Sequence, residues 1–252
     1  MYFYSENRPI TIPKRIVSLV PSQTELLIDL GLKDHIVGIT KFCVHPKHLR
    51  KEKTVIGGTK EVHFDKIKAL QPDIILCNQE ENTKEMVENL ANLAPIHISE
   101  IKTLEDNYQL IWDYAEIFQK QDIGLKIIND IKSNQDDFQK HLQSKPKLKV
   151  AYLIWRDPWM TVGADTFIHH MLEVNNFKNV FAHLSRYPEI DIHKLPDIDL
   201  LLLSSEPYPF KNKHLEEIPL PKEKIRFVNG EFFSWYGSRM IKVFDYFKRT
   251  FW

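Results

Sequence analysis

The fold is decided near the start of the chain, by the stretch Lys14-Arg-Ile-Val-Ser-Leu-Val-Pro-Ser-Gln-Thr-Glu-Leu26. Its segment Arg15–Val20 is rich in β-branched and apolar residues and predicts a buried strand. Ser22-Gln-Thr-Glu25 has the pattern of a capping box, with a hydroxyl at the N-cap and a carboxylate three residues later. Gly31 follows the apolar face of this helix and predicts its end. A strand, a loop and a helix in this order are typical of an α/β fold.

The same alternation of strand and helix patterns continues along the chain. Several strand patterns, such as Leu200-Leu-Leu-Leu203, are apolar without interruption, which is typical of a parallel sheet covered by helices. The predicted strands are Arg15–Val20, His35–Thr40, Asp73–Cys77, Ile96–Ser99, Lys149–Trp155, Asp199–Ser204 and Ile225–Asn229. Further helices are predicted over Phe64–Leu70, Thr83–Leu93, Asp165–Val174 and Trp235–Phe247.

The middle of the chain, Thr103–Gln143, has apolar residues at helical spacing and no strand pattern. It predicts two helices, the second long enough to bridge two lobes. The flanking halves resemble each other, since Ile67–Leu76 and Ile192–Leu201 each combine a short helix, a Pro-Asp break and a buried strand. We therefore expect an α/β fold of two βαβ-type lobes with central, mainly parallel sheets, joined by a long rigid helix. The expected parts are an N-terminal lobe (1–102), a helical linker (103–146) and a C-terminal lobe (147–252).

Composition excludes several classes of function. Lys+Arg and Asp+Glu both number 34, so the formal net charge is zero and a nucleic-acid partner is not expected. No apolar run approaches the roughly 20 residues of a membrane span. The first ten residues lack the features of a secretory signal, which predicts a cytoplasmic protein if Met1 is the native start. If a signal segment was removed, the location is the periplasm or the cell surface. We expect a monomer.

The loops that come after the predicted strands are rich in aromatic residues. Ligands of open α/β sheets bind outside the carboxyl ends of the strands, and aromatic rings supply broad contact area. These loops favour a site for a large, flat, partly apolar ligand, although the rings are also suited to capping the cores of the lobes. The candidate ligand-binding residues are Pro21, Ser22, Phe42, Cys43, His45, Lys60, Trp155, Trp159, Glu206, Tyr208, Glu231, Phe233, Trp235, Tyr236 and Arg239.

Smaller motifs leave alternatives open. Cys43-Val-His45 places a thiol and an imidazole two residues apart, which suits a soft metal or a nucleophilic pair. Two local ligands are too few to assign a metal site, and no catalytic residue is assigned. Gly57-Gly-Thr-Lys60 is suited to an anion cradle or to a tight turn. Arg239 is expected to pair with Glu231 or to hold an anionic ligand.

With these motifs in place, the chain resembles the helical-backbone (class III) substrate-binding proteins of ABC importers, most closely their vitamin B12-binding branch. The resemblance rests on Lys14–Leu26, Asp65–Leu76 and Asp165–Val180. It implies that a cobalamin-like corrinoid or another metal chelate, such as a siderophore or haem, binds in a cleft between the lobes. No tightly bound cofactor is implied. Aromatic residues of the facing loops frame the ligand in this family, and the matching positions are Phe42, Trp155, Trp159, Phe233 and Trp235.

The resemblance also implies an ABC permease that docks on one glutamate of each lobe. Asp65 and His193 stand at these positions, so Asp65 is the candidate docking residue and His193 departs from the pattern. This departure and the lack of signal features fit a cytoplasmic relative that stores, senses or hands over the ligand better than an importer component. The expected activity is binding rather than catalysis. The alternatives are a metal-ion carrier, or an enzyme that acts on a metal chelate through Cys43 and His45.

Overall fold

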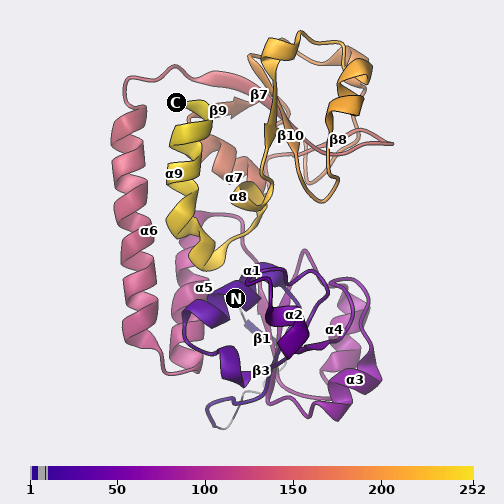
Figure 1. Ribbon diagram of the computed structural model, residues 1–252, viewed down its shortest axis with the longest axis vertical. Helices are drawn as coiled ribbons and strands as arrows, with labels where there is room; N and C mark the ends of the chain where they lie inside the picture. The colour runs from indigo at the N-terminus through magenta and orange to yellow at the C-terminus, as the bar shows by residue number, and fades with distance from the viewer. Residues whose placement is uncertain (1, 5–8, 10) are drawn as a thin grey trace. The chain divides into compact units, whose positions relative to one another are not determined.

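The computed structural model describes residues 2–4, 9 and 11–252 of the chain (Figure 1). Met1, on which the expected location depends, lies outside the described residues. The chain divides into two units. Unit 1 comprises the described residues up to Ile101 together with Glu105–Lys132 and Tyr236–Ile241, and unit 2 comprises Lys102–Leu104, Ser133–Trp235 and Lys242–Trp252.

Unit 1 is built on a six-stranded sheet of order β1-β6-β5-β2-β3-β4. Among its described strands, only β1 runs antiparallel to its neighbour. The strands are β1 (Tyr2–Tyr4), β2 (Ile16–Ser18), β3 (Ile36–Ile39), β4 (Thr54–Val55), β5 (Ile74–Asn78) and β6 (Ile96–Ser99). The helices are α1 (Pro21–Asp29), η1 (Lys33–His35), α2 (Leu49–Glu52), α3 (Phe64–Ala69), α4 (Lys84–Leu90) and α5 (Leu104–Ile117).

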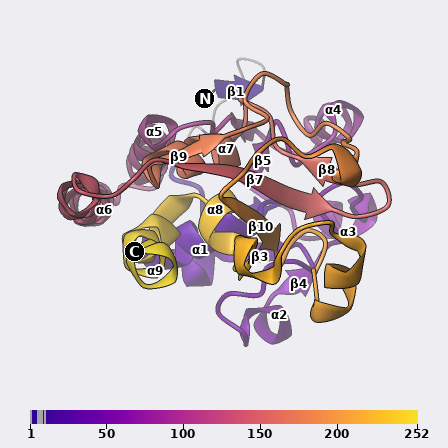
Figure 2. The ribbon, with the colours of Figure 1, turned by 90° about the horizontal axis from the view of Figure 1, so that it is seen from above.

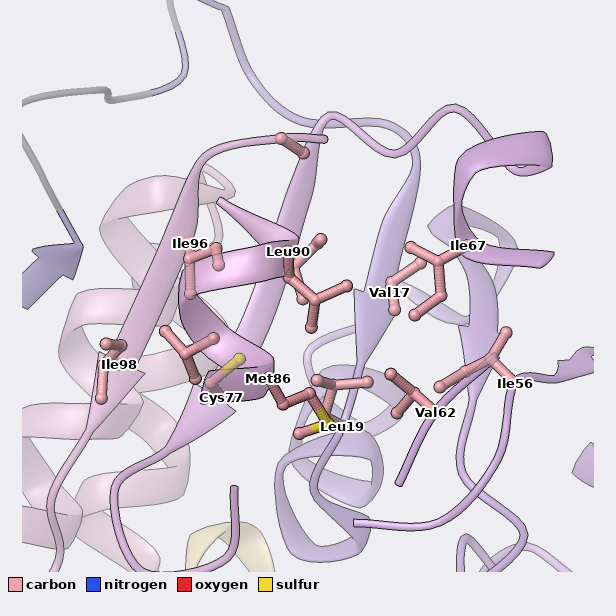
Figure 3. Close-up of a cluster of buried hydrophobic side chains, with 13 residues drawn as sticks. Val17, Leu19, Ile56, Val62, Ile67, Cys77, Met86, Leu90, Ile96 and Ile98 are labelled. Atoms are coloured by element: carbon pink, nitrogen blue, oxygen red, sulfur yellow. The ribbon is translucent and has the colours of Figure 1, made fainter. Parts of the chain in front are cut away.

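Apolar side chains from the sheet and from α3 and α4 form a core of unit 1. Figure 3 shows Val17 of β2 and Ile67 of α3 pointing toward each other, with Leu90 of α4 beside them. All three are fully buried. The continuous apolar runs of the central strands therefore bury both faces of the sheet, as a parallel sheet requires.

Unit 2 is built on a second sheet of order β11-β10-β7-β8, with β9 paired to β7. The central strands β7 and β10 are parallel and lie side by side (Figure 2). The strands are β7 (Leu148–Trp155), β8 (Met160–Thr161), β9 (Phe177–Asn179), β10 (Leu200–Ser204) and β11 (Ile225–Val228). The helices are α7 (Phe167–Val174), η2 (Ile192–Lys194), η3 (Asn212–Glu217), η4 (Lys222–Lys224), α8 (Glu231–Ser234) and α9 (Met240–Phe251), of which the first two residues of α9 belong to unit 1. The short helix η5 (Gly237–Arg239) belongs to unit 1.

A single helix, α6 (Gln121–Leu142), begins in unit 1 and ends in unit 2. Its 22 residues span about 33 Å at 1.5 Å per residue. Gly124 lets α6 approach α5, because a Cβ at this position would lie only 2.5 Å from the Ala115 Cβ. The expected pair of helices over 103–143 is confirmed, and Figure 1 shows α6 as one uninterrupted helix.

The predicted fold class and all seven predicted strands are confirmed, with strand ends displaced by two residues at most. The predicted helix Trp235–Phe247 is wrong. The structure has α8 before Trp235 and η5 and α9 after it. Trp235 is extended, and Gly237 has a φ of +88°. A left-handed residue interrupts a right-handed helix, so the apolar periodicity here belongs to separate elements.

Helix α1 ends as predicted but begins differently. At its C-terminus Gly31 has a φ of +79°. Gly31 N–H donates to Ile28 O and Leu32 N–H donates to Leu27 O, each at 2.9 Å, which is a complete Schellman motif. The predicted capping box is wrong, because Val20 is the N-cap residue and Pro21 occupies the first turn. Proline is favoured there, since its missing N–H would have had no partner in the helix.

Candidate ligand-binding site

The carboxyl ends of the strands gather the candidate residues of each unit. We call these groups of loops the unit 1 edge and the unit 2 edge. The unit 1 edge consists of residues 21–25, 41–45, 57–60, 78–81 and 236–239, and the unit 2 edge consists of residues 155–160, 205–210 and 230–235. Asp65, the candidate docking residue, is separate from both and lies exposed in the first turn of α3. His193 is also exposed, in η2.

The unit 1 edge is organised around the buried amide of Gln23. Its Nε2 donates to Ser99 Oγ at 2.5 Å and to Tyr236 Oη at 3.1 Å, and its Oε1 accepts from Tyr114 Oη at 2.7 Å. Burial raises the pKa of both tyrosines, and for Tyr236 the negative charge of Glu81 adds to this effect. Both phenols are therefore neutral hydrogen-bonding groups. Through Gln23, these hydrogen bonds connect Tyr236 to α1 and α5, although Tyr236 is far from both helices in the sequence.

An ion pair holds the same segment on α1. Arg239 Nε and Nη2 donate to the two carboxylate oxygens of Glu25 at 2.8 and 3.1 Å. The side chains are only 8% and 14% exposed. Burial raises the pKa of Glu25, while Arg239 opposes this shift. Arg239 therefore pairs with Glu25, a partner that the sequence did not suggest. A bidentate pair of this kind fixes geometry as well as charge.

Cys43 lies beneath the surface of the unit 1 edge. It is 1% exposed, and its Sγ lies 3.2 Å from Thr24 Oγ1 and 3.4 Å from Thr40 Oγ1. Burial raises the pKa of this thiol. Because the thiolate is the nucleophile and the metal ligand, this environment disfavours both roles. His45 is half-buried. No group of three His, Cys, Asp or Glu side chains suited to a metal ion occurs among the described residues.

The segment Gly57–Lys60 forms a tight turn. Gly58 N–H donates to Glu61 O at 2.7 Å, and Lys60 Nζ donates to Glu80 O at 2.6 Å. Gly57 has a φ of +127°, and a Cβ there would lie 2.5 Å from Glu61 O. The Gly58 N–H thus closes the turn, and the Lys60 ammonium connects the turn to the loop after β5. Beside it the Phe42 ring is 49% exposed, with Lys41 Nζ 5.2 Å from its centroid.

The unit 2 edge is aromatic. Trp155 lies edge-on to Tyr208 with ring centroids 5.6 Å apart, and Trp159 stacks on Phe210 at 5.9 Å with an interplanar angle of 10°. Tyr208 and Phe210 are themselves in contact at 4.9 Å. Trp155 is 39% exposed, and Tyr208 and Trp159 are half-buried. Four rings from two strand ends therefore form one group that combines internal packing with exposed ring surface.

Polar residues of the unit 2 edge lie next to these rings. Glu206 accepts a hydrogen bond from Ser234 Oγ at 2.6 Å. Gly230 allows this approach, because a Cβ there would lie 2.3 Å from Ser204 Oγ and 2.6 Å from Glu206 Cγ. Glu231 is half-buried at the start of α8.

The candidate ligand-binding residues differ in how much of each side chain is exposed. Among the aromatic ones, Phe233 and Tyr236 are buried, and Trp235 is half-buried. The Phe233 ring packs on Tyr152 at 5.1 Å and on Phe247 at 5.0 Å, so it supports the core of unit 2. Pro21 and Ser22 are buried at the start of α1.

A pocket of about 480 Å³ lies in unit 1 apart from all of these residues. Its lining includes His97 of β6, Asp113 of α5, and Phe3 of β1. His97 is 2% exposed, and burial lowers its pKa to about 4. Asp113 Oδ2 is 3.9 Å from His97 Nε2, too far for a hydrogen bond. Burial also raises the pKa of Asp113. No candidate ligand-binding residue lines this pocket.

Sequence reasoning missed several residues of both edges. In unit 1 these are Gln23, Ser99, Asn107 and Tyr114, of which Asn107 accepts from Gly237 N–H at 2.5 Å. In unit 2 they are Arg156, Phe210, His214 and Glu217. Gln23 stands inside the stretch that we read as a capping box, so its position next to the site was visible in the sequence. Arg156 and Glu217 are 61 residues apart, and no local pattern predicts their ion pair at 2.6 Å.

Comparison with known proteins adds independent findings. A family model described as periplasmic binding protein matches residues 16–205. An uncharacterized ABC transporter substrate-binding lipoprotein of Bacillus subtilis, YvrC, is 30% identical over 189 residues, which cover 71% of this chain and 60% of the relative. A vitamin B12-binding protein of Vibrio vulnificus is 26% identical over 184 residues, which cover 72% of this chain and 67% of the relative. The chain thus matches about two thirds of the length of these relatives.

A solved structure resembles nearly the whole chain. The periplasmic vitamin B12-binding protein BtuF of Vibrio cholerae superposes with a TM-score of 0.82 at 19% sequence identity. The match covers 95% of this chain and 96% of that structure. No helix among the described residues is both long and apolar enough to cross a membrane.

Proposed function

We propose that this chain, which belongs to the periplasmic binding protein family, binds a cobalamin-like corrinoid through the loops at the carboxyl ends of its β-strands. The observation that carries the proposal is the group of rings at the unit 2 edge, with Trp155 39% exposed. Exposed rings offer a flat apolar surface suited to a macrocycle. The relative named a vitamin B12-binding protein supports a corrinoid over other metal chelates, such as a siderophore or haem.

The role in transport is part of the same proposal. One relative is named as a substrate-binding lipoprotein of an ABC transporter, which supports delivery of the ligand to an ABC permease. Such a role places the protein in the periplasm or at the cell surface. Asp65, exposed on α3, is the proposed docking residue. The protein binds its ligand as cargo and releases it unchanged.

Titration with cyanocobalamin tests the proposal. The wild-type protein is expected to bind it saturably, with no change in the ligand after release. The double variant Trp155→Ala/Trp235→Ala is expected to bind at least about tenfold more weakly, since interface tryptophans commonly contribute more than 1 kcal/mol each. Isothermal titration calorimetry measures both affinities, and circular dichroism shows that the fold survives.

Trp252→Ala is the matched control, because its ring packs on Phe177 of unit 2 outside the unit 2 edge. It is expected to bind like the wild type. A double variant that binds as tightly as the wild type contradicts the aromatic site, and a wild type that does not bind cyanocobalamin contradicts the proposed ligand.

A further inference from the structure

The tautomer of His214, next to the unit 2 edge, is determined by a single backbone hydrogen bond. Lys211 N–H donates to His214 Nδ1 at 2.9 Å, so Nδ1 carries no proton. His214 is 3% exposed, and burial, assisted by the positive charges of Lys213 and Arg156, lowers its pKa. The ring is therefore neutral at pH 7, and its one proton is on Nε2.

This tautomer decides the direction of the hydrogen bond to Tyr208. His214 Nε2 lies 3.1 Å from Tyr208 Oη, and because Nε2 carries the proton, Oη is the acceptor. The phenol oxygen thus accepts from His214. The nearby guanidinium of Arg156 can only donate, so it cannot take the phenol proton. That proton is not used in the bond to His214, and no acceptor for it is found among the described residues.

The charges around Tyr208 favour an oxygen acceptor over a cation. The charged groups that influence the pKa of His214 are three cations and one carboxylate, namely Lys211, Lys213, Arg156 and Glu217. That carboxylate is paired with Arg156 at 2.6 Å. Trp155, whose ring is 5.6 Å from that of Tyr208, adds exposed apolar surface beside the hydroxyl.

We infer that Tyr208 is a specificity-determining residue whose hydroxyl donates a hydrogen bond to an oxygen at the edge of a bound tetrapyrrole. His214 is the positioning residue that keeps this hydroxyl proton free for the ligand. The acceptor is the carboxamide oxygen of a corrinoid or the carboxylate oxygen of a haem. The inference rests on the proposed function, since it assigns one polar contact of the same site.

Tyr208→Phe tests this contact, because it removes the hydroxyl and keeps the ring. Affinity is measured by equilibrium titration with cyanocobalamin, which carries carboxamides, and with haemin, which carries carboxylates. Loss of the hydrogen bond is expected to weaken binding about tenfold. Tyr187→Phe is the matched control, since Tyr187 is a half-buried tyrosine of unit 2 whose ring lies against Arg186. It is expected to change affinity less than about twofold.

The two probes distinguish the source of the acceptor. A weakening only with cyanocobalamin assigns a carboxamide, and a weakening only with haemin assigns a carboxylate. Equal affinity of Tyr208→Phe and wild type for every probe that binds overturns the inference and leaves the proposed function intact. A wild type that binds neither probe overturns both.

Two further measurements separate positioning from a merely structural role. His214→Gln is expected to weaken binding in the wild-type background and to have little additional effect in the Tyr208→Phe background. Additive effects contradict the coupling of the two residues. Nitrogen-15 NMR of histidine-labelled protein is expected to show His214 protonated on Nε2 alone, and protonation on Nδ1 overturns the inference without any ligand.

Discussion

The two edges share the strand-to-helix architecture and differ in the chemistry of the loops after the strands. At the unit 1 edge, Gln23 joins Ser99, Tyr114 and Tyr236 in a buried hydrogen-bond network, and Glu25 pairs with Arg239. At the unit 2 edge, β7 ends in Trp155, and the loops after β7 and β10 hold Trp159, Tyr208 and Phe210, whose rings form one packed group with that of Trp155. Chemically different loops therefore occupy equivalent places in two similar sheets.

The two edges therefore depend on different interactions, directional hydrogen bonds in unit 1 and ring packing in unit 2. Buried polar groups need defined partners, so a network like that of Gln23 specifies one geometry. Rings pack without such strict directions and leave apolar surface exposed, which supplies contact area for a ligand. Unit 1 is thus expected to be sensitive to the loss of single polar atoms and to pH. Unit 2 is expected to be sensitive to the loss of ring volume.

The largest expected effect comes from the rings of unit 2. Phe233→Ala removes a fully buried ring that contacts Tyr152 and Phe247, and is expected to lower the free energy of unfolding by about 3–5 kcal/mol. Chemical denaturation followed by circular dichroism measures the change. Phe227→Ala is the control in the same unit, because Phe227 is 40% exposed. Equal losses in the two variants contradict the packing role of Phe233.

Acidic pH is expected to destabilise unit 1 through the protonation of His97. Its pKa in the folded protein, about 4, lies below the ordinary value of 6.5, because burial disfavours the charged ring. The folded state therefore resists protonation, and the stability present above pH 6.5 is lost as the pH falls toward 4. The shift corresponds to a loss of about 3 kcal/mol in the free energy of unfolding.

Denaturation curves at several pH values give the slope of the free energy of unfolding against pH. His97→Gln is expected to flatten it between pH 6.5 and 4, whatever its effect on stability at neutral pH. His48→Gln removes an exposed histidine of the same unit and is expected to leave the slope unchanged. If His97→Gln and wild type lose the same stability over this range, His97 is not the titrating group.

The smallest of these effects is expected in the hydrogen-bond network around Gln23. Gln23→Leu removes the amide oxygen that accepts from the buried Tyr114 hydroxyl, and a buried group that loses its partner costs about 1–3 kcal/mol. The expected loss is at the lower end, because the leucine side chain restores some apolar packing. Gln109→Leu is the control, since Gln109 bonds Asp113 on an exposed face of α5.

A second substitution distinguishes a lost hydrogen bond from a packing defect. Tyr114→Phe in the Gln23→Leu background removes the orphan hydroxyl and is expected to recover part of the stability, as measured by the denaturation midpoint. No recovery would show that the shape of Gln23, and not its hydrogen bonds, matters most.

The secondary structure was largely predictable from local sequence. Continuous apolar runs such as Leu200–Leu203 and the stop at Gly31 identify strands and helix ends, because they depend on neighbours only a few residues away. The short strands β1, β4, β8 and β9 were missed, since runs of two or three residues carry little periodicity. The helix expected over Trp235–Phe247 failed because Gly237 adopts a left-handed conformation.

The candidate site was predictable in place and in part of its chemistry. The rule that ligands bind at strand ends selected loops that hold Trp155, Trp159 and Tyr208, and the structure brings these three rings into one group with Phe210. The pairing of Arg239 with Glu25 across 214 residues was not predictable, because nothing local to either residue specifies its partner.

Local sequence patterns are sufficient to predict that this protein alternates strands and helices in two halves around a helical middle, and that aromatic residues come after its strands. These properties depend on periodicity and on short-range turn chemistry. Long-range packing, in contrast, places Tyr236 and Arg239 in unit 1, buries the Cys43 thiol and puts the proton of His214 on Nε2. Such outcomes depend on which distant groups become neighbours, because burial and partners determine what a side chain can do.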